Sequence, residues 1–106
     1  MMPADTEHLT DSFYYILIAL LEPRHGYLIM QFIEEISDGD FSMGPATLYT
    51  NIKKLLKIEF IIPHSEVDRK KIYLITAKGK EALLAEMKRR EKMILQGKKV
   101  LEKMEG

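Results

Sequence analysis

The residues best suited to a specific chemistry lie in one segment, from Gly44 to Lys57. Gly44 can act as an N-cap and Pro45 as a first helical residue, so this segment predicts a helix. At about 100° per residue, one side of that helix is apolar and carries Leu48, Ile52, Leu55 and Leu56. The other side carries Ala46, Thr47, Thr50, Lys53, Lys54 and Lys57. Short hydroxyl side chains can bond to the base edges of DNA and lysines can neutralise its phosphates, although an ordinary solvated helix can also carry lysines.

A second group of cations, Arg69, Lys70 and Lys71, lies between two short apolar segments. Residues 60–62 and 72–75 predict two strands, which would form a hairpin around these cations. A hairpin with a basic tip directly after a cationic helix is typical of a winged helix, in which the wing lies along the DNA backbone. The alternative is an ordinary solvated turn. Together the two cationic groups predict binding to double-stranded DNA.

The distribution of charge along the chain favours the same interpretation. The 106 residues include 16 basic and 16 acidic side chains, so the net charge is zero. Residues 1–40 hold one base and eight acids, whereas residues 41–106 hold fifteen bases and eight acids. Such a split favours a polyanionic partner for the basic part, and an unevenly charged solvated exterior is the alternative.

The elements that position these residues can be predicted from hydrophobic periodicity. Thr10 can cap a helix that ends near Leu21, and a second helix runs from Tyr27 to about Ser37. Thr76 can cap a last helix that begins at Ala77. The order helix, helix, helix, strand, strand, helix predicts an α+β fold, mostly α, of the winged helix-turn-helix type. We expect a DNA-binding domain over residues 1–76 and a C-terminal dimerisation helix over residues 77–106.

The C-terminal helix carries an apolar stripe with spacings of four and seven residues. Its members are Leu83, Met87, Ile94, Leu101 and Met104, and the residues that interrupt it are Arg90 and Gly97. A helix over residues 77–104 would be about 40 Å long, which is more than one small domain can cover. The stripe therefore predicts a homodimer interface, and a frayed charged tail is the alternative.

Other chemistry has little support in the sequence. The chain has no cysteine, and its three histidines lack metal-ligand spacing, so we expect no metal and no cofactor. Nucleophile motifs and phosphate-binding glycine loops are also missing, which argues against an enzyme. No apolar run approaches a membrane span, and residues 1–7 are acidic, so a cytoplasmic protein is expected.

Four motifs carry a resemblance to a known family. They are Leu9-Thr10-Asp11-Ser12-Phe13, His25-Gly26-Tyr27-Leu28-Ile29, Gly44-Pro45-Ala46-Thr47-Leu48-Tyr49 and Tyr73-Leu74-Ile75-Thr76-Ala77-Lys78-Gly79. In this order the chain resembles the PadR family of bacterial transcription regulators, in particular its short-chain branch with a single C-terminal helix. The resemblance implies a homodimer on a palindromic operator and a repressor function. It also implies that Thr47, Tyr49 and Thr50 face DNA and that Arg69 to Lys71 form the basic wing strand.

The chain departs from the family pattern at several points. Glu59 stands where the family commonly has glycine, so the turn after the cationic helix is expected to be reshaped. The wing also lacks the glycines often seen at its tip, and the chain lacks the tryptophans with which some members stack flat drugs.

Two further hypotheses remain at the level of sequence. Tyr14 and Tyr15 form an aromatic face that could border a pocket for an unknown small-molecule effector, and core packing is the alternative. A winged helix used only for contacts with other proteins is the alternative to DNA binding, but it would not need the lysine-bearing face.

Overall fold

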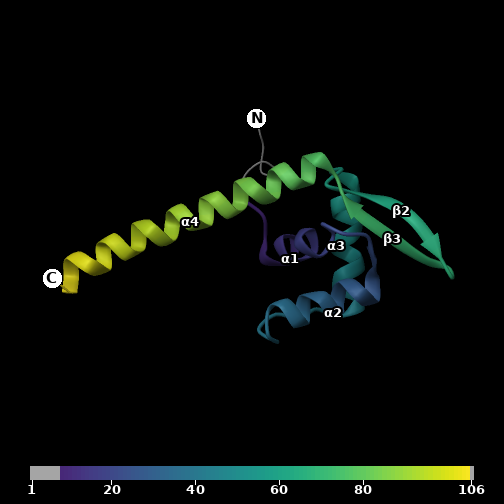
Figure 1. Cartoon of the computed structure of the whole chain (residues 1–106), viewed down its shortest axis with the longest axis horizontal. Helices are drawn as coiled ribbons and strands as arrows, with labels where there is room; N and C mark the ends of the chain where they lie inside the picture. The colour runs from purple at the N-terminus through teal and green to yellow at the C-terminus, as the bar shows by residue number, and fades with distance from the viewer. Residues whose placement is uncertain (1–7, 106) are drawn as a thin grey trace.

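The computed structural model describes residues 8–105 and contains four helices and three strands in that range (Figure 1). The elements are α1 (Asp11–Ala19), β1 (Arg24–His25), α2 (Gly26–Ile36), α3 (Pro45–Lys57), β2 (Ile61–Val67), β3 (Lys70–Ile75) and α4 (Ala77–Glu105). The predicted order is confirmed, with β1 as an addition. The acidic segment at residues 1–7 lies outside the described residues.

The predicted caps begin the helices. The Thr10 hydroxyl oxygen accepts a hydrogen bond of 3.1 Å from the Phe13 N–H, so α1 begins at Asp11. Gly44 is the N-cap of α3 and Pro45 is its first residue, as the sequence predicts. The Thr76 hydroxyl caps α4 by accepting from the Gly79 N–H at 3.0 Å, and it donates to the Glu59 carbonyl at 2.7 Å. Thr76 therefore joins the start of α4 to the turn that follows α3.

The turn after α3 corrects one expectation from the sequence. Glu59 has a φ of 64°, which is the left-handed conformation in which glycine is usual. The Glu59 N–H donates to the Leu56 carbonyl and the Phe60 N–H to the Leu55 carbonyl, both at 3.0 Å. These two bonds form a Schellman motif. The turn is therefore not reshaped, because its hydrogen bonds hold Glu59 in the conformation that glycine would adopt.

The sheet is antiparallel and has the strand order β1-β3-β2. Val67 pairs with Lys70, so Asp68 and Arg69 alone form the turn at the tip of the hairpin. Their φ values of 51° and 66° are both positive, which is typical of a type I′ turn. The tip thus reaches a tight hairpin without glycine. A bulge between Pro63 and Ser65 interrupts the pairing of β2 with β3.

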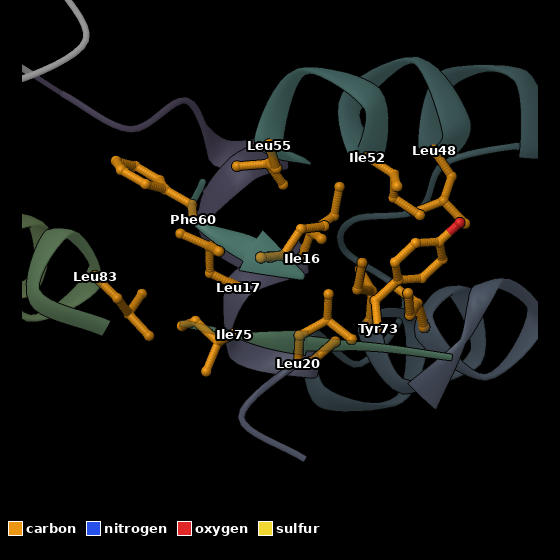
Figure 2. Packing of buried hydrophobic residues seen from close by; sticks show 14 of the residues in the cluster. Ile16, Leu17, Leu20, Leu48, Ile52, Leu55, Phe60, Tyr73, Ile75 and Leu83 are labelled. Carbon is orange, nitrogen blue, oxygen red and sulfur yellow. The ribbon is translucent and has the colours of Figure 1, made fainter. Parts of the chain in front are cut away.

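The core lies where α1, α2, α3 and the sheet meet the first turns of α4 (Figure 2). Its largest fully buried side chains are Ile16, Leu17, Leu20, Ile29, Ile33, Leu48, Leu55, Ile61 and Leu83. α3 contributes the predicted apolar side, which fixes the rotation of the helix and leaves its polar side in solvent. Gly79 allows α4 to approach the body closely, because a Cβ atom there would overlap the Phe60 carbonyl oxygen.

The long helix α4 runs without interruption to Glu105, and Gly97 does not break it. Every residue from Glu91 to Glu105 is exposed. Figure 1 shows this part of α4 extending away from the body on the side opposite the β2–β3 hairpin. The molecule accordingly measures 60 × 36 × 21 Å. The boundary at residues 76 and 77 stays a prediction, and the first turns of α4 pack into the core.

Candidate nucleic-acid interface

The outward side of α3 is polar and cationic, as its sequence predicts. The predicted residues on it are all exposed, namely Thr47, Tyr49, Thr50, Lys53, Lys54 and Lys57. The helix contains no acidic residue. Thr47 and Thr50 lie in its first two turns, and the lysines follow toward its C-terminus. Short hydroxyl side chains therefore come first along this surface and longer cationic side chains come later.

The wing, defined as β2, β3 and their turn, carries the second group of cations. Arg69, Lys70 and Lys71 are all exposed, with Arg69 in the turn and the two lysines at the start of β3. Because side chains alternate along a strand, Lys71 shares the face of Tyr73, which is buried toward the core, and Lys70 lies on the other face. The two lysines are therefore presented in different directions.

The cations on these two elements are free of acidic partners. Within residues 8–105, the ion pairs of the structure involve Arg24, Arg89 and Arg90 and leave out the cations of α3 and the wing. Glu66 pairs in register with Lys71 on the neighbouring strand without forming an ion pair. A lysine without an intramolecular carboxylate can neutralise a phosphate with no ion pair to break first.

A groove of about 340 Å³ lies between α3 and the wing. It is lined by His25, Gly26, Tyr27, Tyr49, Arg69, Lys70, Lys71 and Tyr73. Tyr49 lies against Gly26, where a Cβ atom would overlap its hydroxyl oxygen. The His25-Gly26-Tyr27 motif and Tyr49 are therefore in direct contact, which their spacing in the sequence did not reveal.

Tyr73 lies at the floor of this groove, with its hydroxyl directed toward Leu48 in the core (Figure 2). Burial raises the pKa of the Tyr73 hydroxyl above its usual value of 10.0, and the nearby Tyr49 raises this pKa further. The phenol therefore stays neutral at physiological pH. The groove owes its positive charge to the wing cations.

The predicted dimer residues do not lie together on one free surface. Leu83 is 1% exposed and packs into the core of its own chain, so its assignment to a dimer interface is corrected. Met87 is half-buried against that core. Ile94, Leu101 and Met104 are exposed by 56%, 59% and 81%.

The exposed apolar face of α4 is wider than the sequence stripe. At about 100° per residue, Met93, Ile94, Val100, Leu101 and Met104 all lie within about 60° of Gly97 around the helix. We call these five residues, with Gly97 at their centre, the distal α4 face. Met93 and Val100 were missed because the sequence stripe was followed from Leu83 through Ile94 and Leu101, and each of these two residues directly precedes one of its members. Gly97 is a small residue at the centre of this face and does not interrupt it.

The two tyrosines of the expected effector pocket lie on α1 and are half-buried. The Tyr15 ring stacks on Phe41 with 4.8 Å between ring centroids, and the Arg90 guanidinium lies 4.6 Å from the centre of the Tyr14 ring. The groove beside the wing is lined by other residues. The effector pocket therefore stays a prediction.

Two kinds of site have no structural support in the part of the chain from residue 8 to 105. No group of three or more histidine, cysteine or acidic side chains in that range could hold a metal ion. None of the helices described there combines the length and the apolar character needed to cross a membrane.

Comparison with known proteins gives one family and several structures of the same fold. The model of the transcriptional regulator PadR-like family matches residues 16–85, which include α3, the wing and the start of α4. No curated protein sequence matches the chain.

Three solved structures illustrate the likeness. RosR from H. salinarum is 21% identical, with a TM-score of 0.67, and the alignment covers 92% of this chain and 99% of RosR. A transcriptional regulator from Clostridium thermocellum is 22% identical, with a TM-score of 0.64 and coverage of 88% and 90%. F93 from STIV, described as a winged-helix DNA-binding protein, is 18% identical, with a TM-score of 0.71 and coverage of 83% and 96%. At these identities the likeness establishes the winged-helix fold.

Proposed function

Because this chain belongs to the PadR-like family of transcriptional regulators, we propose that it is a sequence-specific repressor that binds a palindromic operator as a homodimer. The observation that carries the proposal is the exposed side of α3, where hydroxyls and unpaired lysines lie beside a wing that carries three more cations. The family is one of transcriptional regulators, so no catalytic activity is proposed.

In the proposed complex, α3 enters the major groove and the wing follows the DNA backbone. Thr47 and Thr50 contact base edges, because their short side chains permit a close approach of the helix. Lys53, Lys54 and Lys57 neutralise phosphates that flank the groove. Tyr49 lies against Gly26 at the start of α2 and lines the groove beside the wing, where it faces DNA in this proposal.

The wing supplies further phosphate contacts in this proposal. Arg69, Lys70 and Lys71 are exposed around a two-residue turn, which keeps the tip narrow. Glu66 and Asp68 offset part of this positive charge. The three wing cations form no ion pair with these carboxylates in the structure, so they can contribute affinity for phosphates. The contacts of the wing are to phosphates and carry no sequence information.

The homodimer is supported by the distal α4 face. Five large apolar side chains there are each more than half exposed, and α4 extends beyond the part of the body that could cover them. A second copy of the chain offers the same face, and a two-fold axis brings identical faces together. Two copies related in this way present two α3 helices to DNA, which matches a palindrome. A dimer bound across a promoter excludes polymerase.

We also propose that a planar effector binds near Tyr14 and Tyr15. The support is the position of Tyr14, whose ring contacts Tyr15 and lies under the Arg90 guanidinium of α4, so a molecule bound there would change the direction of α4 relative to the body. We also propose that the protein acts in the cytoplasm, together with the DNA that it regulates.

Selection of duplexes from random DNA by the full-length protein tests the proposal. We expect enrichment of an inverted repeat whose half-sites lie about one helical turn or a multiple of it apart. The variant Lys53→Glu/Lys54→Glu should lose this enrichment, because it reverses two charges on α3. Lys98→Glu/Lys99→Glu, which reverses a matching pair on α4, should retain it. Recovery of only unselected sequence by the wild type would contradict the proposal.

A further inference from the structure

A buried carboxylate connects α4 to the start of α1. Glu86 is 2% exposed and accepts hydrogen bonds from the Leu9 N–H at 3.1 Å, from Arg89 Nε at 3.2 Å and from Arg90 Nε at 2.6 Å. Within the described residues, no buried side-chain polar atom lacks a partner. A buried and fully bonded ionic group favours one arrangement of the elements that it joins.

Arg90 is the residue that carries this connection across to α1. Its Nη2 donates to the Leu9 carbonyl at 3.2 Å and to Asp11 Oδ1 at 3.0 Å, while its guanidinium lies over the Tyr14 ring. Arg90 thus contacts a backbone group, a carboxylate and an aromatic face of the N-terminal segment. Among the described residues, the preceding Arg89 bonds only to Glu86 and Met93, which are both on α4.

Arg90 also marks the point where α4 leaves the body. Beyond it, residues 91–105 are all exposed and form about 22 Å of free helix at about 1.5 Å per residue. A rotation of about 10° at Arg90 would displace the end of this helix by about 4 Å, which exceeds the rise of about 3.4 Å per base pair. A small change in the direction of α4 at Arg90 would therefore displace the dimer interface by more than the rise of one base pair.

We infer that Arg90 is a positioning residue that fixes the direction of α4 and so sets the spacing of the two half-sites that the dimer accepts. The inference rests on the proposed function, because it concerns the geometry of a DNA-bound homodimer. Arg90 lies within about 20° of Gly97 around the helix, so the contact with α1 and the distal α4 face lie along one side of α4. By fixing the direction of α4, Arg90 therefore also fixes the position of the distal α4 face relative to the body.

The test measures affinity for a series of duplexes that carry the selected half-sites at different spacings. The wild type should prefer one spacing over those one base pair longer or shorter by about tenfold or more. Arg90→Met should reduce this ratio at least about threefold, because the helix is no longer held in one direction. Arg89→Met removes a matching charge that does not reach α1, and it should keep the wild-type ratio. Asp11→Asn, at the exposed end of the contact, should shift the ratio in the same direction as Arg90→Met.

The possible results separate the inference from the proposed function. A wild type without dimers or without DNA binding would contradict the proposed function itself. Equal loss of affinity at every spacing in Arg90→Met, with the ratio unchanged within twofold, would show a merely structural role and overturn the inference. An unchanged ratio in Asp11→Asn as well would confirm that result.

A second readout does not require DNA. Because the chain has no cysteine, a single Gln31→Cys on the exposed surface of α2 can carry a spin label. The distance distribution between the two labels of a dimer should be narrow in the wild-type background. It should broaden with Arg90→Met and stay narrow with Arg89→Met. A narrow distribution at the same distance in all three backgrounds would overturn the inference.

Discussion

The wing and the distal half of α4 project from opposite ends of the molecule, and the tip of the wing and residues 91–105 are both exposed, but their chemistry differs (Figure 1). Charged side chains surround the tip of the wing, and they are well solvated without any partner. Five large apolar side chains form the distal α4 face, and they are exposed at a cost of about 25 cal/mol for each Å² of apolar surface. The tip of the wing can therefore stay in solvent and is available to bind a polyanion. The distal α4 face is more stable when a second apolar surface covers it.

The difference shows that exposure by itself does not indicate the kind of partner. α3 and the wing are anchored in the core by the buried side chains of Leu48 and Tyr73. The distal half of α4 has no such support beyond Arg90. A preformed surface suits recognition of DNA, and an unsupported apolar helix suits pairing with a second copy.

The largest effect is expected from charges placed on the distal α4 face. Ile94→Glu/Leu101→Glu should convert the dimer into a monomer, because it would bury carboxylates in an apolar interface. Affinity for a two-half-site operator should then fall at least about 100-fold, because the two domains no longer bind as one unit. Sedimentation equilibrium and DNA titration measure the two quantities.

A matched control lies on the same helix. Leu95 is 60% exposed but lies about 160° around α4 from Gly97. Leu95→Glu should leave both the dimer and the affinity for DNA unchanged. If Leu95→Glu dissociated the dimer while Ile94→Glu/Leu101→Glu did not, the assignment of the distal α4 face would be wrong. A wild-type monomer at about 50 μM would contradict the dimer directly.

The next effect concerns the first turns of α3. Thr47→Val and Thr50→Val remove one hydroxyl each with little change in shape. We expect a loss of about 1–3 kcal/mol for each base contact that is removed, and a changed preference at the corresponding operator position. Titration of the selected operator and its single-base variants measures this preference. Affinity for random DNA serves as the internal control, and an equal loss on random DNA would show that these residues do not read sequence.

A third effect concerns Glu86, which joins α4 to the start of α1. Burial raises the pKa of its carboxyl, but hydrogen bonds from Arg89, Arg90 and the Leu9 N–H outweigh burial and lower the pKa from 4.5 to about 2. A folded-state pKa below the unfolded value adds stability that is present above pH 4.5 and is lost as the pH falls toward 2. We expect a loss on the order of 2 kcal/mol over this range, less than the full linkage value because both arginines are partly exposed.

Urea denaturation from pH 7 to pH 2 at constant protein concentration checks this effect. Glu86→Gln should be less stable than the wild type at pH 7. Its free energy of unfolding should also decrease less than that of the wild type between pH 4.5 and pH 2. Glu81→Gln, on an exposed position of the same helix, should keep the wild-type profile. Identical profiles for all three proteins would show that Glu86 does not contribute.

The smallest effect is expected from single cations of the wing. Lys70→Ala should flatten the slope of log affinity against log salt by about 0.9 per phosphate contact, or about 1.8 for a dimer. The preference for the operator over random DNA should survive. Lys80→Ala, at an exposed lysine of α4 outside the tip of the wing, should leave the slope unchanged. An unchanged slope for Lys70→Ala, and likewise for Arg69 and Lys71, would remove the wing from the DNA interface.

Local signals in the sequence were sufficient for most of the fold. The period of Leu48, Ile52 and Leu55 and the Gly44-Pro45 start identified α3 and its exposed side, since both depend on neighbouring residues alone. β1 was missed because a strand of two residues has no periodicity, and only its pairing with β3 defines it. The conformation of Glu59 was also missed, because the hydrogen bonds of the turn outweigh the preference of a single residue.

The candidate sites could be predicted only in part. The cations of α3 and the wing could be identified because the apolar side of α3 and the two short apolar segments around residues 69–71 are local patterns. Leu83 was misassigned because periodicity identifies an apolar side of α4 but not where the body stops covering it. The contact between Glu86, Arg90 and Leu9 joins residues 77 to 81 positions apart, so no local pattern could reveal it.

Hydrogen–deuterium exchange of the full-length protein, with and without its selected operator, tests the contrast between the two exposed regions most directly. Amides of residues 91–105 should exchange slowly in the free protein, because pairing of two copies protects α4, and dilution below the dimer dissociation constant should speed this exchange. Operator DNA should slow exchange around residues 66–71 of the wing and leave residues 91–105 unchanged. Rapid, concentration-independent exchange in residues 91–105, or a wing that DNA does not protect, would contradict the assignment of a second copy to α4 and of DNA to the wing.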